Sequence, residues 1–360
     1  MSARPIADDG IDAQAHARLN LDVTNLKNNW RALRDRAGVD TGAAVKADGY
    51  GLGAQFVVDM LADAGARDFF VAHWGEAAAI DLPDGCRLAV LHGVQEGDEP
   101  LASQLPARPV LNSPEQARRW RAIAPDEACD VMVDTGMNRL GFDLDELGAL
   151  DGLRIDTLHS HLACADEPGH PLNRKQLERF RSVVGRVGAT RTSLANSAGV
   201  FLGDDYAFDL VRPGIALYGG IPVEAARDVI MPVVGIEARL LQRRLVRQGD
   251  SVGYGATFVA ERDMPVGVLN LGYADGYPRR LSGLGTASWN GTVLPMLGRV
   301  SMDLIAVDLS DARDAGEGDW IDVQFDLADT AAAAGLSQYE LLTGLGSRFE
   351  AQYWTEYQKA

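Results

Sequence analysis

Lys46 stands where an apolar run gives way to a glycine-rich segment, in the stretch AAVKADGYGLG (43–53). A lone lysine on a strand is usually a solvated edge residue. If this run is buried in a parallel sheet, however, the ammonium must be paired, used covalently or lowered in pKa, because burying an isolated charge is costly. A lysine that can become neutral is a Schiff-base nucleophile, so the pattern predicts covalent amine chemistry at Lys46.

Further polar side chains follow other apolar runs. Arg139 comes after VDTGMN, His161 lies in IDTLHSHLA, Asn196 and Ser197 close TSLANS, and Arg212 lies in FDLVRPG. Each alone has an ordinary structural explanation, such as a surface charge, an ion pair or a hydrogen-bonded core histidine. If all the runs are parallel strands of one barrel, their carboxyl ends meet, and these side chains would face one site.

Arg212 precedes PGIALYGG. It could form a structural ion pair, or it could face the ring nitrogen of a cofactor while the backbone N–H groups of Gly214 and Ile215 bind a phosphate. The HSH segment is a weak metal motif, because two histidines share a strand face but no third ligand is evident nearby. We therefore predict no metal.

The elements that must position these residues follow the pattern of successive βα units, which is typical of an α/β protein with a parallel sheet. Helix-like stretches lie between most of the runs, one of them capped by Ser113 with Pro114 as its first residue. Eight runs predict a closed (β/α)₈ barrel of the TIM type. The runs are 43–47, 68–72, 87–93, 108–112, 130–134, 155–163, 192–197 and 208–214.

After about residue 235 the chain changes to β-runs with glycine turns and few helices, which predicts a second, mostly β domain. The predicted domains are 12–235 and 236–360. Three loops of the second domain combine glycine with reactive or aromatic side chains. They are SVGYGATF with Tyr254, LGYADGYPR with Tyr273, and GRVSMD with Met302 and Asp303.

The composition of the chain limits the kinds of molecule that it is expected to bind. The net charge of −17 disfavours nucleic acid and membrane surfaces, so a small molecule is expected. Three widely spaced cysteines suggest neither disulfides nor zinc. The first 19 residues contain no apolar signal region, and no later run is long enough to span a membrane. We therefore expect a cytoplasmic protein.

Eight segments, in order along the chain, resemble the alanine racemase family of fold-type III enzymes, which use pyridoxal 5′-phosphate (PLP). The resemblance implies PLP-dependent interconversion of L-alanine and D-alanine. It also implies a head-to-tail homodimer, in which the second domain of one subunit completes the site in the other subunit's barrel. The segments are VKADGYGLG, VDTGMNRLG, HLACADE, ANSAG, VRPGIALYG, SVGYGATF, LGYADGYPR and GRVSMD.

The resemblance also implies a role for each matching residue. Lys46 resembles the Schiff-base lysine and one catalytic base, and Tyr254 the second base on the opposite face of the cofactor. Arg212 resembles the arginine at the pyridine nitrogen, and His161 the histidine that links this arginine to the tyrosine. The remaining matches are Tyr50, Asn196, Ser197, Gly214 and Ile215 at the cofactor, Arg139 and Met302 at the substrate, and Tyr273 and Asp303 along the access path.

Two positions depart from the family pattern. Many members carry a carbamylated lysine two residues before DTG, where this chain has Met132. Methionine cannot carry a carbamate, so Arg139 must be oriented by other means. A late tyrosine that binds phosphate in some members aligns with Ser347, which could still donate a hydrogen bond.

Three alternatives stay open. A racemase of broader specificity, or one for serine, fits the same motifs, because one hydroxyl or methylene changes binding by only about 1 to 3 kcal/mol. A non-catalytic PLP-binding barrel is disfavoured by the second domain and Tyr254. A PLP decarboxylase of the same fold type is disfavoured because the second domain contains no cysteine.

Overall fold

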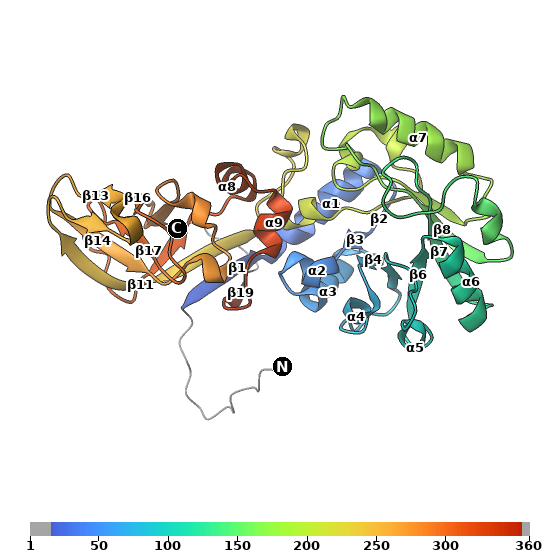
Figure 1. Cartoon of the computed structure of the whole chain (residues 1–360), viewed down its shortest axis with the longest axis horizontal. Helices are drawn as coiled ribbons and strands as arrows, with labels where there is room; N and C mark the ends of the chain where they lie inside the picture. Colours follow the sequence, from blue (N-terminus) through green and yellow to red (C-terminus); the bar gives the residue numbers. More distant parts are fainter. Residues whose placement is uncertain (1–15, 355–360) are drawn as a thin grey trace.

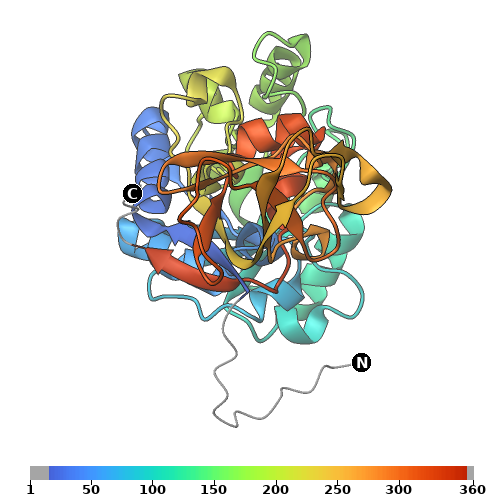
Figure 2. The ribbon, with the colours of Figure 1, turned by 90° about the vertical axis from the view of Figure 1, so that its left-hand side faces the viewer.

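A computed structural model describes residues 16–354. The chain forms two domains that lie end to end, a barrel with surrounding helices and a β domain (Figure 1). Seen along the long axis, the β domain lies in front of the barrel (Figure 2). The predicted α/β class, with a parallel barrel and a mostly β C-terminal domain, is confirmed. The predicted domain limits at 12 and 360 fall outside the described residues. So does most of the N-terminal segment, in which the sequence predicts no signal region.

Parallel strands in the order β3-β4-β5-β6-β7-β8-β9 form the barrel wall, and β10 closes it. β10 pairs with β2, and the Arg212 N–H donates to the Ala195 carbonyl at 2.9 Å. Gly42 separates β2 from β3, and any side chain there would collide with Asp68 and Phe70 of β4. The strands are β2 (Asp40–Thr41), β3 (Ala43–Ala44), β4 (Asp68–Val71), β5 (Arg87–Val90), β6 (Ala107–Leu111), β7 (Ala128–Met132), β8 (Arg154–His159), β9 (Arg191–Ser193) and β10 (Leu210–Val211).

Helices cover the outside of the barrel, and α6 begins where the sequence predicts. The Ser113 side chain accepts the Gln116 N–H and Pro114 starts α6 (Pro114–Ile123), as expected for a capped helix. Apolar side chains from successive strands pack together in the interior near the pocket, including Phe70, Val110 and Met132. The other barrel helices are α1 (Val23–Ala37), α2 (Lys46–Tyr50), α3 (Ala54–Ala64), α4 (Trp74–Ala77), α5 (Glu99–Ala102) and α7 (Pro171–Val183).

The second domain is built around the long strand β11 (Val234–Val246). Its first half alternates buried and half-buried residues, as expected for a strand with one face on a core. This half pairs with β1 and β18, and the second half pairs with β14. The remaining strands are β1 (Ala17–Asp22), β12 (Ser251–Val252), β13 (Phe258–Val259), β14 (Met264–Leu269), β15 (Thr286–Trp289), β16 (Thr292–Leu297), β17 (Ile305–Asp308), β18 (Trp320–Val323) and β19 (Glu350–Trp354).

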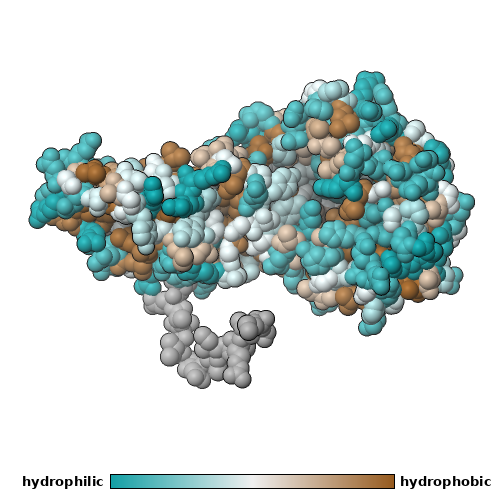
Figure 3. All heavy atoms as spheres, viewed as in Figure 1, coloured by the Kyte–Doolittle hydropathy of each residue, from teal (hydrophilic) through white to brown (hydrophobic). Residues whose placement is uncertain are grey.

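β1 lies in the sequence range assigned to the barrel, yet it joins the C-terminal sheet between β11 and β19. Two helices, α8 (Leu327–Ala334) and α9 (Gln338–Thr343), return the chain toward the barrel. Polar side chains cover most of the face shown in Figure 3. No helix within residues 16–354 is long and apolar enough to cross a membrane.

Candidate active site

A pocket opens at the carboxyl ends of the barrel strands, where the sequence places its reactive residues. Its walls also include side chains that the motifs did not single out, notably Met137 and Tyr339. The predicted residues in the wall are Lys46, Tyr50, Arg139, His161, Asn196, Ser197, Arg212, Gly214 and Ile215.

Lys46 begins α2, a turn whose next residues have left-handed backbone angles. Ala47, Asp48 and Tyr50 have φ between 53° and 59°, and Gly49 has φ of 63°. Burial lowers the pKa of Lys46, the Arg139 guanidinium lowers it further, and the Glu76 carboxylate opposes both effects. A lysine amine at the pocket is thereby shifted toward its nucleophilic, neutral form.

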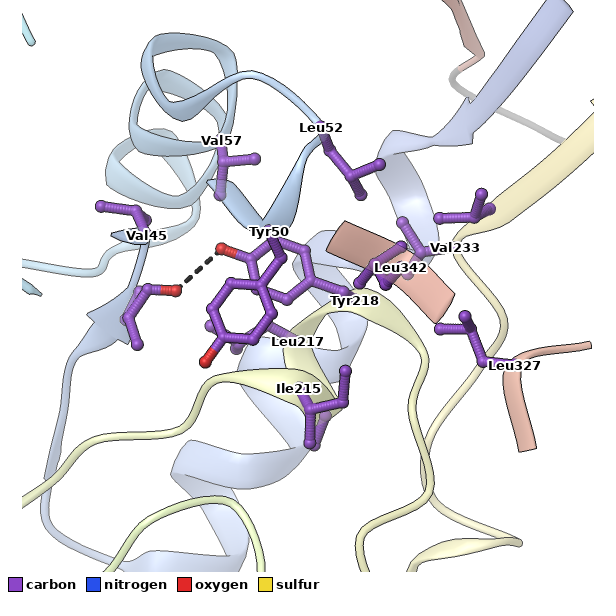
Figure 4. Close-up of a cluster of buried hydrophobic side chains, with 14 of the residues drawn as sticks. Val45, Tyr50, Leu52, Val57, Ile215, Leu217, Tyr218, Val233, Leu327 and Leu342 are labelled. Carbon is purple, nitrogen blue, oxygen red and sulfur yellow. Dashed lines mark hydrogen bonds between the residues drawn. The ribbon is translucent and has the colours of Figure 1, made fainter. Parts of the chain in front are cut away.

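The Tyr50 ring stacks on Tyr218 with centroids 4.6 Å apart, inside an apolar cluster that includes Ile215 (Figure 4). The Tyr218 hydroxyl donates to the Ala44 carbonyl at 2.8 Å, which ties this cluster to β3. The Tyr50 hydroxyl instead points at Gly214, where a Cβ would lie 2.2 Å from it. Only glycine leaves room for that hydroxyl.

Ser197 organises the turn after β10. Its hydroxyl oxygen accepts the N–H of Gly214 at 2.8 Å and of Ala216 at 3.3 Å, so its own hydrogen is free to be donated into the pocket. Ile215 is the first residue of the short helix η4 (Ile215–Tyr218), so its backbone N–H has no hydrogen-bond acceptor within the helix. Asn196 is used differently, since its side chain accepts the Gly199 N–H at 2.9 Å.

Arg212 is buried, and neighbouring side chains and one backbone carbonyl surround its guanidinium. One nitrogen donates to Ser193 and lies 3.2 Å from Nδ1 of His159. The other donates to the Ser160 carbonyl at 2.7 Å and lies 3.5 Å from Nδ1 of His161. Burial lowers the pKa of Arg212 to about 10, which still leaves it charged at neutral pH.

His161 is kept neutral. Burial, followed by the charges of Arg212 and Arg139, lowers its pKa to about 3. Because Nδ1 faces the Arg212 N–H groups, it must act as the acceptor, and the proton of the neutral ring lies on Nε2.

Behind Arg212, a chain of alternating charges runs down the barrel interior. Nε2 of His159 lies 3.5 Å from Asp130, and both residues are almost fully buried. Arg108 contacts Asp130 and Asp156, and Arg191 joins Asp156 at 3.1 Å. These pairs neutralise buried charge that would otherwise be costly.

Arg139 is placed by its loop. Asp134 accepts the N–H groups of Gly136 and Met137 at 2.7 and 2.9 Å, and the loop is closed where the Phe142 N–H donates to the Met132 carbonyl at 2.8 Å. The Arg139 side chain has no hydrogen bond or ion pair to any residue between 16 and 354. A guanidinium beside Lys46 without an acidic partner is suited to receiving an anion.

Five predicted residues lie away from this pocket. Among the described residues, its wall includes none of the C-terminal positions Tyr254, Tyr273, Met302, Asp303 and Ser347. Tyr254 is 72% exposed in the turn between β12 and β13, and β13 lies at the end of the C-terminal domain far from the barrel (Figure 1). Asp303 pairs instead with Arg348 at 2.8 Å.

Tyr339 is a pocket residue that the sequence analysis did not identify as a site residue. It lies on α9, its ring centroid is 6.2 Å from that of Tyr50, and burial raises the pKa of its hydroxyl. Gln338 fixes α9 to the barrel, because its side-chain amide both accepts from and donates to the backbone of Ile221. The capping box at Ser337 signals the start of a helix, but nothing local signals that this helix reaches the barrel.

Comparisons with known proteins agree with this geometry. A family model described as "Alanine racemase, N-terminal domain" matches residues 21–222, and "Alanine racemase, C-terminal domain" matches residues 233–353. The alanine racemase of Rhizobium meliloti (strain 1021) is 44% identical over 94% of this chain and 97% of its own length. The biosynthetic alanine racemase of Agrobacterium fabrum is 43% identical over 96% of each chain.

Solved structures agree as well. A crystal structure of alanine racemase from Bartonella henselae with covalently bound pyridoxal phosphate gives a TM-score of 0.86 at 36% identity, covering 95% of this chain and all of that one. Alanine racemase from Streptomyces coelicolor A3(2) gives a TM-score of 0.87 at 33% identity, covering 95% of this chain and 98% of its own. A lone barrel would match only the first family model, whereas here both domain models match in order. The chain belongs to the alanine racemase family.

Proposed function

We propose that this protein interconverts L-alanine and D-alanine with PLP bound in the barrel pocket. When bound, PLP supplies a carbonyl carbon that condenses with amines and a conjugated ring that accepts the electron pair left when a Cα–H bond breaks. The relative from Bartonella henselae holds this cofactor covalently.

The pocket fits PLP at both of its ends. At one end, the Tyr50 hydroxyl makes no hydrogen bond to any residue between 16 and 354. The hydroxyl hydrogen of Ser197 and the backbone N–H of Ile215 are also free to donate at this end of the pocket. These donors suit a phosphate. At the other end Arg212, which stays charged at neutral pH, can only donate to a ring nitrogen, and this nitrogen must then stay unprotonated. An unprotonated ring withdraws fewer electrons, which favours return of the proton to Cα.

Lys46 acts on one face of the bound substrate and removes or returns the Cα proton at its Nζ atom. We assign the opposite face to Tyr254 of a second copy of the chain, which implies a homodimer with shared sites. This assignment is supported by the exposure of Tyr254 and by its place at the end of the molecule remote from its own pocket (Figure 1).

The free guanidinium of Arg139 binds the substrate carboxylate, which fixes Cα in the pocket. His161 accepts from Arg212 at Nδ1 and presents Nε2–H toward the pocket mouth, where the phenol oxygen of the incoming tyrosine would accept it. We place Met302, Tyr273 and Asp303 of the second copy at the mouth, where they line the access path. The three cysteines are free, which agrees with a cytoplasmic location.

The observation that carries this proposal is the half-buried lysine amine, lowered in pKa, in the wall of a pocket rich in anion donors. The test is to reduce the PLP-loaded protein with borohydride and to identify the modified residue by peptide mass. We expect Lys46 to be modified, and Lys46→Ala to lose both the modification and alanine racemisation. Lys27→Ala, at an exposed ion pair with Asp63, is the matched control and should keep both. PLP retained covalently in Lys46→Ala would contradict the assignment.

Substrate breadth is tested by measuring the interconversion of the D and L forms of alanine, serine, lysine and arginine. We expect alanine to be preferred. Turnover of serine or of the basic amino acids at rates similar to alanine would favour the broader-specificity racemase.

Tyr339, and not Ser347, contributes the late hydroxyl at the phosphate end of the pocket. Tyr339 faces the ring of Tyr50, whereas Ser347 is exposed and lies outside the pocket wall. We expect Tyr339→Phe to weaken PLP binding about tenfold, the equivalent of one charge-assisted hydrogen bond, while Ser347→Ala binds normally. The measurement is a fluorescence titration with PLP and with pyridoxal, which lacks the phosphate. An equal loss of affinity for both compounds would contradict the phosphate role.

A further inference from the structure

Glu76 joins two backbone segments at the edge of the pocket. One carboxylate oxygen accepts the N–H of Ala47 at 2.7 Å, and the other accepts the N–H of Ala72 at 2.7 Å. Ala47 directly follows Lys46, and Ala72 follows the end of β4. A single side chain on α4 therefore ties the lysine-bearing turn to the barrel wall.

The turn needs such a tie because its backbone is strained. Ala47, Asp48 and Tyr50 adopt left-handed angles, and each non-glycine residue in that conformation costs about 1 to 2 kcal/mol. Such conformations persist only where the surroundings hold them in place. Asp48 holds the far end of the turn by accepting the Ala54 N–H at 2.7 Å. Glu76 holds the near end, next to the lysine.

Charged and titratable groups reach Lys46 from several elements. Arg139 approaches from the loop after β7 and Glu76 from α4, while His161 follows β8 and His92 follows β5. The carboxylate of Glu76 is the group among these that favours the charged amine. Loss of the Glu76 carboxylate would therefore change the charge around Lys46 and would also remove a hydrogen bond to the backbone next to it.

We infer that Glu76 is a positioning residue that fixes the Lys46 turn through its two backbone hydrogen bonds and aims the amine into the pocket. This inference rests on the proposed role of Lys46. Glu76 itself is not among the residues that line the pocket.

The test compares Glu76→Gln with Glu99→Gln. Glutamine keeps the length of the side chain but replaces one acceptor oxygen with an NH₂ group, so one of the two backbone N–H groups loses its partner. Glu99 also accepts a backbone N–H, from Gly97 at 2.7 Å, but at the start of α5 away from the pocket. It is therefore a matched control for the chemical change alone.

The first readout needs no cofactor. Hydrogen exchange of the Ala47 or the Ala72 amide should become at least tenfold faster in Glu76→Gln, with the urea unfolding midpoint close to that of Glu99→Gln. The second readout is the rate at which PLP becomes fixed to Lys46 by borohydride, which should fall about tenfold. The third is steady-state kinetics, where kcat should fall while KM for alanine stays within about twofold, because Arg139 is untouched.

Unchanged exchange at both Ala47 and Ala72, or an equal effect in Glu99→Gln, would overturn the inference. So would a KM defect without a kcat defect, since that would place Glu76 in substrate binding. If wild-type protein fixes no PLP at Lys46, the proposed function fails, whereas the exchange measurement still decides whether Glu76 holds the turn.

Discussion

Burial changes the chemistry of single side chains at this site. Arg212 keeps its charge although burial lowers its pKa to about 10, while His161 beside it is neutral with a pKa lowered to about 3. Two neighbouring basic groups thus hold one positive charge between them. That arrangement leaves Nδ1 of His161 free to accept from Arg212, which a charged imidazolium could not do.

The neutral state of His161 predicts a pH dependence of stability. The unfolded chain binds a proton at this histidine below about pH 6.5, whereas the folded chain does so only near pH 3. The unfolded state therefore holds more protons in this window, and the free energy of unfolding falls as the pH falls. His161→Gln should reduce that slope by about 1.4 kcal/mol per pH unit between about pH 4 and 5.5, where the unfolded histidine is almost fully protonated and the folded one is not. Urea unfolding of the cofactor-free protein measures it, and an unchanged slope would show that His161 is protonated in the folded state.

At the scale of elements, the loop between β7 and Phe142 is ordered although the chain has Met132 where many family members carry a carbamylated lysine. Met132 packs with Phe70 and Val110 in the barrel interior, where a lysine carbamate would be an added charge. The loop that carries Arg139 is instead fixed by Asp134 and by backbone hydrogen bonds at Phe142. The loop thus fixes the backbone at Arg139 without a modified lysine.

This arrangement predicts that activity is independent of bicarbonate. With methionine at position 132, alanine racemisation should be the same in buffers depleted of carbon dioxide and in buffers with added bicarbonate. Asp134→Ala should raise KM for alanine roughly tenfold by removing two hydrogen bonds that hold the loop, with Asp143→Ala as a control outside the turn. Stimulation of the wild-type protein by bicarbonate would indicate that a carbamylated lysine elsewhere in the chain reaches the site.

At the scale of the whole molecule, the two domains lie end to end, so the barrel pocket and Tyr254 are at opposite parts of one chain (Figure 1). The hairpin that carries Tyr254 is exposed along most of its length. A head-to-tail pair of chains would bring each hairpin to the other barrel, because a two-fold axis uses the same contact twice.

A mixed dimer tests this arrangement. Lys46→Ala and Tyr254→Phe should each be nearly inactive alone. If sites are shared, a dimer with one subunit of each kind collects both defects in one site and leaves the other intact. Random exchange makes half of the dimers mixed, so roughly a quarter of wild-type activity should return when the two variants are unfolded and refolded together.

Subunit exchange is verified by mass-tagging one variant. If exchange is complete and activity does not return, Tyr254 belongs to its own subunit's site or to no site, and the shared-site proposal is wrong.

The sequence by itself predicted the features that depend on local chemistry and short-range order. Apolar runs with intervening helices predicted the barrel, because strands buried on both faces must be apolar throughout. Reactive residues at the ends of those runs predicted the pocket, because parallel strands bring their carboxyl ends together. Because Lys46, Arg212 and Gly214 follow apolar runs, this arrangement of parallel strands predicted that they lie in the pocket.

Only the tertiary structure decided which distant segments meet. β1 joins the C-terminal sheet, α9 carries Tyr339 to the barrel mouth, and Glu76 reaches back to the lysine turn. It also separated Ser347 and Tyr254 from the pocket of their own chain. None of these contacts leaves a periodic pattern in the sequence, because each depends on how separate segments of the chain pack together and not on the propensity of any one segment.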